Sequence, residues 1–543
     1  MGRYVYNGAM GYLKKHEKTV ILLAGAMIQL LAFAVVLFYL YKRCRSEFNA
    51  DYTDTILWAE TAVRSGHFYN PEYWYAYFLP FSGIPLMIPI VKAFGLTYFA
   101  HQLGMTVFAV IFAASLILFM RTIECSYGEA FAFSGITMIL MCASSVTRMI
   151  FYGHVIHYSL VIVFMCIAFF FLTRSSVFVP DSKHSLTFDI ILAIWCMLCV
   201  TNGMATFILF FVPFAGCLVI ERFLDRTPIS YEHDKALFGR IAIYTAGGIA
   251  GYIIKMFVFP SSEYENSITA LLPSDGWVWK QSPFLLEWIK VLTDDSSADV
   301  LMQSFDGIKI LCMYVLALVL LLLPVVAVFS YRKIKSRLLR LLIIFHWLMF
   351  ATTMLTYSVS YALVSNWRLC HLICSSVILS LLYIRYMLKE KLKVRWFIFF
   401  VPFLALCCLI AMLAVKSIPS AVNANETDQL IEIYRENGLT RGYASSFWNS
   451  TNSANVLSDN TICVAPITIN TDGSYEVRHY QSEPSEYEDV PGVDRYFVVV
   501  DSTDMAYAAD TLGANKVEEI KFQDNLYIWV FDRNIFSGLE PVF

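Results

Sequence analysis

Charge is scarce in this sequence: only 15% of its 543 residues are charged, whereas 58% are hydrophobic. The mean hydropathy is +0.59. Soluble globular chains carry about 25% charged residues, so this composition excludes an ordinary soluble domain and indicates a polytopic membrane protein. The formal net charge of −3 also lacks the basic excess of a nucleic-acid-binding protein, and we expect no nucleic-acid partner.

Paired cysteine spacings, internal repeats, low-complexity runs and glycine-rich phosphate loops are absent as well. Most of the 13 cysteines lie inside apolar runs, where they act as small core residues and form no disulfide framework or zinc motif. The first apolar run, 19–41, is long enough to span a bilayer and lacks a small-residue cleavage site, so we expect it to remain as an anchor.

Long apolar runs dominate what is present. Each has about the 20 residues that a bilayer requires, which predicts an α-helical membrane protein with about 11 spans. The predicted spans are 19–41, 103–121, 129–147, 154–173, 186–202, 204–220, 239–258, 306–330, 338–360, 366–387 and 395–416. Segment 82–95 is apolar but short and contains prolines, so it predicts an interfacial or re-entrant helix.

Basic residues predict the orientation of these spans. Clusters at 3–18, 222–240, 332–340 and 385–395 fall on one side if 82–95 does not cross the membrane. The positive-inside rule then puts the N-terminus in the cytoplasm and the C-terminus outside, in a multi-pass protein of the cell membrane. Lys42, Arg43 and Arg45, just beyond the first span, are the exception.

Three polar pieces then lie outside the membrane: loop 42–102, loop 259–305 and the tail 417–543. We therefore divide the chain into a transmembrane domain, 1–416, and an extracytoplasmic α/β domain, 417–543. In the tail, 428–437 and 446–457 have helical patterns, and the strand pattern occurs at 461–469, 475–480, 496–501, 516–522 and 526–531.

Two carboxylates begin the first outer loop, in the stretch Asp51-Tyr52-Thr53-Asp54. Three residues apart, Asp51 and Asp54 would share one face of a helix. A carboxylate at the membrane boundary can serve as general base towards an acceptor hydroxyl. The alternative is structural, with Asp51 or Thr53 capping a helix that ends at Gly66.

The order of these features resembles the start of the GT-C membrane glycosyltransferases. A first span leads to an outer loop that begins with Asp; an Ala/Gly-punctuated helix, a Pro-containing apolar stretch at 79–86 and the sequence Phe-Gly-Leu-Thr at 94–97 follow. The pattern is similar to the protein O-mannosyltransferase and aminoarabinose-transferase branch and covers most of 15–225. This resemblance implies a sugar donor on a polyprenyl-phosphate carrier and assigns Asp51 as the best match to the catalytic Asp, with Asp54 the poorer match.

The resemblance also points to the second outer loop, where relatives carry an acidic or basic functional residue. His154 and His157 stand three apart there and suit a metal, a proton relay or phosphate. Two interfacial histidines bonded to the backbone are the alternative, because two histidines alone do not make a metal site. Arg148 suits the lipid phosphate or, equally, an interfacial anchor.

One departure concerns a lysine that relatives often carry in a Thr-Lys-Gly turn near the carrier phosphate. This chain has Thr201-Asn202-Gly203, so the charge is missing at Asn202. Either another cation replaces it, or the donor is bound differently. The candidate replacements are Lys280, Arg368 and His371; an interfacial anchor is the alternative role for Arg368.

The sequence thus predicts an inverting GT-C glycosyltransferase of the hexosyltransferase type. It would move a sugar from a polyprenyl-phosphate carrier to a glycan, lipid or protein of the cell envelope. A divalent cation, Mg²⁺ or Mn²⁺, is a candidate cofactor. The rival hypotheses are a flippase for lipid-linked oligosaccharide and a non-catalytic envelope scaffold. Few ionisable residues lie deep in the predicted spans, Lys255 being the main one, and this disfavours transport.

Overall fold

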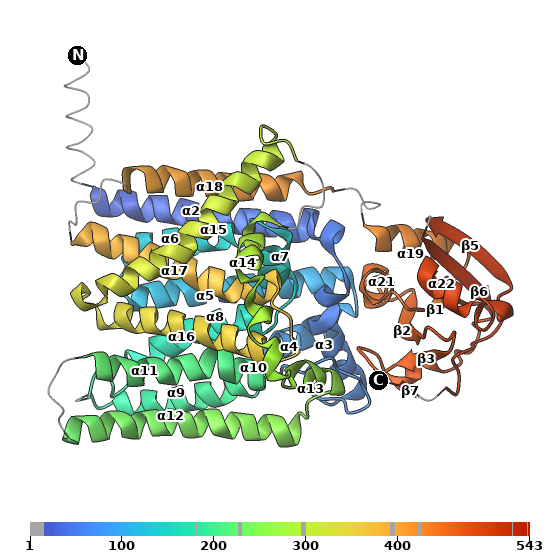
Figure 1. Ribbon diagram of the computed structural model, residues 1–543, viewed down its shortest axis with the longest axis horizontal. Helices are drawn as coiled ribbons and strands as arrows, with labels where there is room; N and C mark the ends of the chain where they lie inside the picture. Colours follow the sequence, from blue (N-terminus) through green and yellow to red (C-terminus); the bar gives the residue numbers. More distant parts are fainter. Residues whose placement is uncertain are drawn as a thin grey trace, which may run out of the picture.

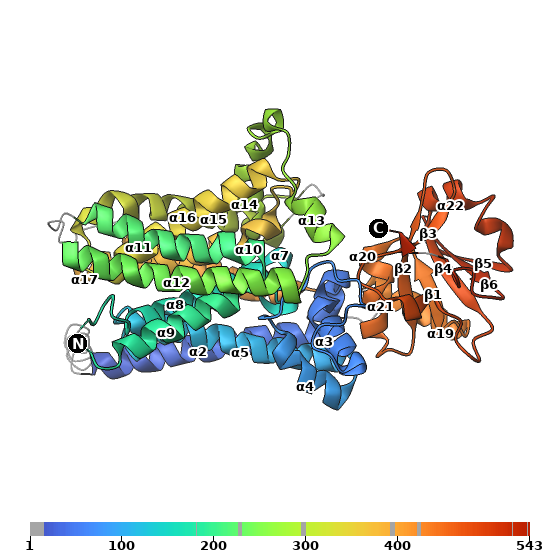
Figure 2. The same ribbon diagram turned by 90° about the horizontal axis from the view of Figure 1, so that it is seen from below.

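A bundle of apolar helices and a smaller C-terminal domain lie end to end in the computed structural model (Figure 1). The structure describes residues 16–180, 182–225, 231–294, 300–390, 397–420, 425–523, 525–539 and 541–542. The long helices run along a common direction, so their termini meet at two ends of the bundle, as the perpendicular view in Figure 2 also shows. We call the end that faces the C-terminal domain the domain end.

Helices occupy all eleven predicted apolar segments. They are α2 (Glu17–Lys42), α5 (Tyr98–Thr122), α6 (Tyr127–Leu140), α8 (His157–Leu172), α9 (Ser185–Val200), α11 (Val212–Leu224), α12 (Tyr231–Val258), α15 (Phe305–Ser330), α16 (Arg337–Val359), α17 (Cys370–Lys389) and α18 (Phe397–Ser417).

The predicted number of about 11 spans is not confirmed. Within the described ranges, 8 helices are long and apolar enough to cross a membrane, or up to 9 if a bent pair ending in α8 counts as one span. Helices α6 and α9 have 14 and 16 residues. At a rise of about 1.5 Å per residue, they fall short of a hydrocarbon core about 30 Å thick.

Small residues allow the helices of the bundle to approach closely. A Cβ atom on Gly25 of α2 would lie 2.0 Å from the carbonyl oxygen of Gly128 in α6, and one on Gly251 of α12 would lie 2.1 Å from that of Met197 in α9. Close contact through glycine is a common way for helices to associate in lipid. Lipid tails are as apolar as the side chains, so the hydrophobic effect does not drive the helices together and close packing takes its place.

The short apolar segment 82–95 forms helix α4 (Ile84–Phe94), with Pro85 in its first turn and Pro89 inside it. Its 11 residues cannot cross a bilayer, in agreement with the predicted interfacial or re-entrant helix. Loop 259–305 also forms helices, α13 (Glu263–Thr269) and α14 (Phe284–Thr293), which the sequence did not predict.

The C-terminal domain is built on a mixed seven-stranded sheet in the order β5-β6-β4-β1-β2-β3-β7. The strands are β1 (Arg441–Ala444), β2 (Cys463–Ile469), β3 (Tyr475–Arg478), β4 (Tyr496–Asp501), β5 (Glu518–Gln523), β6 (Leu526–Phe531) and β7 (Pro541–Val542). The helices are α19 (Glu426–Glu436), α20 (Phe447–Ser450), α21 (Asn452–Leu457) and α22 (Ser502–Ala508). β1 is parallel to both of its neighbours, β2 and β4.

Ion pairs and backbone bonds hold this domain against the bundle. Arg45, just beyond α2, makes a bidentate ion pair with Asp428 of α19, with a shortest distance of 2.6 Å. Trp74 donates its backbone N–H to the Ser482 carbonyl at 2.8 Å. Arg45, one of the cations that depart from the positive-inside pattern, therefore has a docking partner in the C-terminal domain.

Candidate active site

The start of the first loop folds into two short 3₁₀ turns followed by helix α3. The turns are η1 (Cys44–Glu47) and η2 (Ala50–Thr53), and α3 spans Asp54–Ser65. The side chain of Asn49 accepts a bond from the Asp51 N–H at 3.0 Å and so caps η2. Helix α3 has no side-chain cap at Thr53 and ends at Gly66 in the left-handed region, with φ 72°. Capping therefore falls to Asn49, which leaves the carboxylates of Asp51 and Asp54 for other contacts.

Asp54 is buried and fully engaged. Its Oδ2 lies 2.8 Å from His154 Nε2 and accepts from the Tyr77 hydroxyl at 3.3 Å, and its Oδ1 accepts from Gln481 Nε2 at 2.6 Å. Tyr77 also lies 3.3 Å from His154 Nε2. Asp54 is thus the centre of a network that joins the first loop, the second loop and the C-terminal domain.

His154 reaches Asp54 because the chain breaks before α8. Helix α7 (Ser145–Arg148) continues into a π-turn, η3 (Met149–Gly153), and the axis bends by 62° before α8 begins. A Cβ on Gly153 would lie 2.1 Å from the ring of Tyr52, so only glycine permits this approach. Irregular backbone at membrane depth occurs where it is buried in protein or lines a cavity.

Asp51 differs from Asp54 in its surroundings. Its side chain is mostly buried, and among the described residues its carboxylate forms no hydrogen bond. Burial raises the pKa of Asp51 to about 6; His154 lowers the pKa, and the charge of Asp54 raises it. A carboxylate with this pKa and no fixed partner is suited to accept a proton near neutral pH.

Segment 73–82 connects the site to the rest of the loops. Tyr73 donates to Gln481 Oε1 at 3.4 Å, and the Phe81 backbone exchanges bonds with the Asn202 side chain at 2.8 and 2.9 Å. Lys255, at the end of α12, donates to the Phe78 carbonyl at 3.3 Å. The residue next to Phe78 is Tyr77, so this segment carries contacts from α12 directly to Asp54.

Lys255 also lies at the turn where the expected lysine is missing. Gly203 has φ +91°, and a Cβ there would lie 3.2 Å from Lys255 Cε. The Lys255 ammonium is 2% exposed and pairs with Glu265 of α13 at 3.2 Å. Lys255 was not among the three candidate replacements for a cation at Asn202. Its sequence signal was that of an ionisable residue inside a predicted span, which marks a functional candidate but does not show which turn it reaches.

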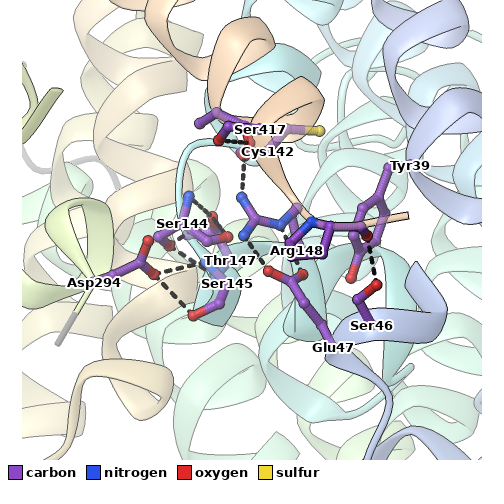
Figure 3. A network of polar contacts seen from close by, with 12 residues as sticks. Tyr39, Ser46, Glu47, Cys142, Ser144, Ser145, Thr147, Arg148, Asp294 and Ser417 are labelled. Atoms are coloured by element: carbon purple, nitrogen blue, oxygen red, sulfur yellow. Dashed lines mark hydrogen bonds and ion pairs between the residues drawn. The ribbon is translucent and has the colours of Figure 1, made fainter. Parts of the chain in front are cut away.

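Arg148 is held by protein groups, as Figure 3 shows. Its guanidinium makes a bidentate pair with Glu47, at 2.9 and 2.5 Å, and donates to the Cys142 carbonyl at 2.8 Å. In the same network, Asp294 accepts from the N–H and hydroxyl of Ser145 at 2.7 and 2.8 Å. Arg148 therefore anchors the broken helix to η1, with its donors directed at Glu47 and Cys142.

The remaining predicted residues are distributed around the site. The ring of His157 lies 6.1 Å from that of Tyr77 and so borders the Asp54 network. Lys280 donates to the carbonyls of Ser360 and Ala362, and burial lowers its pKa. His371 is buried, 3.0 Å from the Thr353 hydroxyl.

Arg368 is packed against aromatic rings and influences Tyr264 of loop 259–305. It donates to the Leu363 carbonyl at 2.6 Å and stacks on the rings of Trp367 and Tyr357. Burial raises the pKa of Tyr264; Arg368 lowers it, and Asp51 raises it. Arg368 and Asp51 thus shift the pKa of the same tyrosine in opposite directions, because their charges have opposite signs.

The described part of the chain contains no group of three or more His, Cys, Asp or Glu side chains placed to hold a metal ion. His154 bonds Asp54, and His154 and His157, the two histidines whose spacing suits a metal, belong to no such group.

Comparison with known proteins finds a similar fold among solved structures but no relative by sequence. No protein-family model matches the chain, and no curated protein matches it. Among solved structures, ArnT from Cupriavidus metallidurans bound to undecaprenyl phosphate is similar with a TM-score of 0.54 at 10% identity, over 95% of this chain and 99% of that one. The same protein in the apo state gives a TM-score of 0.44 at 10% identity, over 95% and 98%. The chain therefore has a fold similar to that of ArnT, in agreement with the fold that the resemblance implied.

Proposed function

We propose that this chain, which has the ArnT fold, is a membrane glycosyltransferase that takes a sugar from a polyprenyl-phosphate carrier. The observation that carries the proposal is the pair Asp51 and Asp54 at the domain end of the bundle. Three partners hold the Asp54 carboxylate, whereas the Asp51 carboxylate has no hydrogen-bond partner in the part of the chain that the structure describes. The ArnT structure contains undecaprenyl phosphate, a carrier lipid of the proposed class.

Asp51 is the general base in this proposal. It takes the proton of the acceptor hydroxyl as the oxygen attacks the anomeric carbon, and the carbon–oxygen bond to the carrier phosphate breaks, leaving the electron pair on the phosphate. Attack on the face opposite the leaving group inverts the anomeric centre. Asp54 positions His154, Tyr77 and Gln481 around the reacting groups.

The cation for the carrier phosphate is Arg368, which forms no ion pair among the described residues. Arg368 and Asp51 both influence the pKa of Tyr264, so the cation acts in the surroundings of the proposed base. Arg148 and Lys255 are the poorer candidates because Glu47 and Glu265 already neutralise them. A phosphate gains most from a cation that retains donors for it.

The membrane orientation belongs to the same proposal. Helices α11, α15 and α17 end, and helices α12, α16 and α18 begin, at the end of the bundle away from the C-terminal domain (Figure 1). Basic residues concentrate in the connections between these helices, although 226 and 391–395, like 3–15, lie outside the described residues. By the positive-inside rule that end is cytoplasmic, and the reaction takes place on the outer face.

Deletion of the gene tests the function. Envelope glycans of the deletion strain would be compared for sugar composition and linkage, with complementation by wild type, Asp51→Asn and the matched control Asp275→Asn, an exposed loop aspartate. We expect one sugar to disappear and to return with wild type and Asp275→Asn only. An unchanged glycan profile in the deletion strain would contradict a transferase and favour a scaffold.

Two further measurements separate the alternatives. Purified protein in liposomes would be assayed for release of carrier phosphate from a polyprenyl-phosphate sugar and, separately, for movement of that lipid across the bilayer. Movement without cleavage would identify a flippase. The sequence also suggested a divalent cation as a candidate cofactor. Turnover would be measured in the presence of a chelator, with and without added Mg²⁺ or Mn²⁺. Full turnover in chelator would exclude a requirement for the metal.

A further inference from the structure

The sheet of the C-terminal domain has a topological switch point at β1. The chain leaves β1 through α20 and α21 to reach β2 on one side, whereas β4 lies on the other side, and both neighbours are parallel to β1. In open α/β sheets, ligands bind in the crevice outside the carboxyl ends of the strands, at the point where the strand order changes direction.

A cavity of about 480 Å³ lies at these strand ends. Ser445 directly follows β1, Thr468 and Ile469 end β2, and Asp504 lies in α22 after β4. Helix α13 of loop 259–305 forms the opposite wall with Tyr264 and Ser267; Figures 1 and 2 both show α13 beside the C-terminal domain. The cavity is therefore built from the switch point and from a loop of the bundle.

The lining combines aromatic rings with a positively charged and a negatively charged side chain. Tyr264 and Tyr480 meet edge to face at 5.1 Å, and Arg478 lies over the Tyr480 ring at 5.0 Å. Burial raises the pKa of Asp504, and the Ser445 hydroxyl lowers it. A saccharide ring has an apolar face for tyrosine and hydroxyls that both donate and accept, which matches a cavity offering Arg478 and Asp504 together.

The inner wall of the cavity borders the proposed catalytic carboxylates. Tyr480 lines the cavity, and the next residue, Gln481, donates to Asp54 at 2.6 Å. Burial raises the pKa of Tyr480 well above its ordinary value, and the charges of Asp54 and Asp51 raise it further. A molecule in this cavity therefore lies against the residue that precedes Gln481, the hydrogen-bond partner of Asp54.

We propose that the cavity between α13 and the switch point of the C-terminal sheet binds the acceptor, and that the acceptor portion bound there is a saccharide. The proposal rests on the proposed function. Neither the sequence motifs nor the fold comparison assigns a ligand to this cavity. In this proposal the two substrates bind at different places, the carrier lipid at the bundle and the acceptor glycan at the C-terminal domain.

Binding to the full-length protein in nanodiscs tests the proposal. The probes are fluorescently labelled oligosaccharides released by mild acid from the host envelope and, in a separate titration, undecaprenyl phosphate. The variants are Arg478→Ala and Asp504→Asn, the second of which keeps the side-chain shape. Asp510→Asn, an exposed aspartate soon after α22, is the matched control.

We expect each cavity variant to weaken oligosaccharide binding about tenfold or more, as loss of a hydrogen bond to a charged group implies. Asp510→Asn should leave it unchanged, and undecaprenyl phosphate should bind equally to all four proteins. Equal oligosaccharide affinity in wild type and both cavity variants would overturn the site. Restoration of a glycan in the host without any oligosaccharide binding by wild type would overturn the saccharide class and point to a protein or lipid acceptor.

A different set of results would contradict the proposed function. Wild type that binds no undecaprenyl phosphate and restores no envelope sugar would contradict the transferase. Oligosaccharide binding that depends on Asp504 would still support the cavity in that case.

Discussion

Gln481 Nε2 donates a 2.6 Å hydrogen bond to Asp54 Oδ1, across 427 positions of sequence. Gln481 is 2% exposed and adopts φ 50° in the left-handed region, and its Oε1 accepts from Trp58 Nε1 at 3.2 Å. Gln481 thus has a strained backbone and a buried side-chain amide, and this amide joins the C-terminal domain to the first loop. The C-terminal domain is therefore part of the site.

Substitution of Gln481 should therefore loosen the domain and slow the reaction together. Gln481→Gly tolerates the backbone conformation but removes the amide, and leaving the buried Asp54 oxygen without its donor costs about 1–3 kcal/mol. Limited proteolysis around 417–425 and the rate of sugar transfer should both change. Asn460→Gly, at an exposed residue with φ 60°, is the control that changes neither.

The two carboxylates should respond differently to the same substitution. Asp51→Asn removes the proposed base and is expected to slow transfer by about 10²–10⁴ with an unchanged Tm. Asp54→Asn breaks contacts with His154, Tyr77 or Gln481, so both the rate and Tm should fall. Normal transfer by Asp51→Asn would leave Asp54 as the only candidate base in the pair.

Transfer should depend on pH through Asp51. Because its pKa is raised to about 6 and the base must be deprotonated to accept a proton, kcat/KM should fall below pH 6 and reach a plateau above it. The profile would be measured with the acceptor well below its KM, so that it reports the free enzyme, and compared with that of Asp275→Asn. A midpoint near the ordinary pKa of an aspartate, about 4, would be inconsistent with this assignment.

Arg148 should prove structural. Arg148→Ala leaves the partly buried Glu47 without its partner, which costs at most the 3–5 kcal/mol, roughly, of breaking a buried pair, whereas replacing both residues by Met and Leu should recover most of the loss. The measurement is Tm, together with the Kd for undecaprenyl phosphate. Arg174→Ala, at an exposed arginine, is the control. Weaker carrier binding by a stable double variant would show that Arg148 holds the phosphate.

Glu486 should make the domain contact sensitive to pH. Its Oε2 is buried with no hydrogen-bond partner in the described part of the chain. Burial raises its pKa to about 8, Glu483 and Glu60 raise it, and Arg64 and Arg441 lower it. Because the folded-state pKa exceeds the unfolded value of about 4.3, this contribution to stability is complete below pH 4 and is lost as the pH rises to 8.

Glu486→Gln tests this contribution. The variant keeps the shape of the neutral side chain and should reduce the loss of Tm between pH 5 and 8 relative to wild type. An identical fall in Tm for the variant and wild type would assign the pH dependence to other groups.

Local pattern was sufficient for much of the fold. Strands β4 and β6 begin and end where the sequence predicted, at 496–501 and 526–531, because both are continuous apolar runs in the middle of the sheet. The central strand β1 was missed, since it has four residues and includes Gly442. Only the packed structure explains that glycine: a Cβ there would lie 2.5 Å from the ring of Phe497.

The sequence by itself determined the apolar helices, the polar tail and the candidate residues Asp51, Asp54 and His154, because hydropathy and the order of motifs are local properties of the chain. Tertiary structure decided how they are used. Gln481 and His154 reach Asp54 from positions far away in sequence, and these contacts make Asp54 the carboxylate that is held in place. Long-range packing sets burial and hydrogen bonding, and these in turn set the chemistry of each carboxylate.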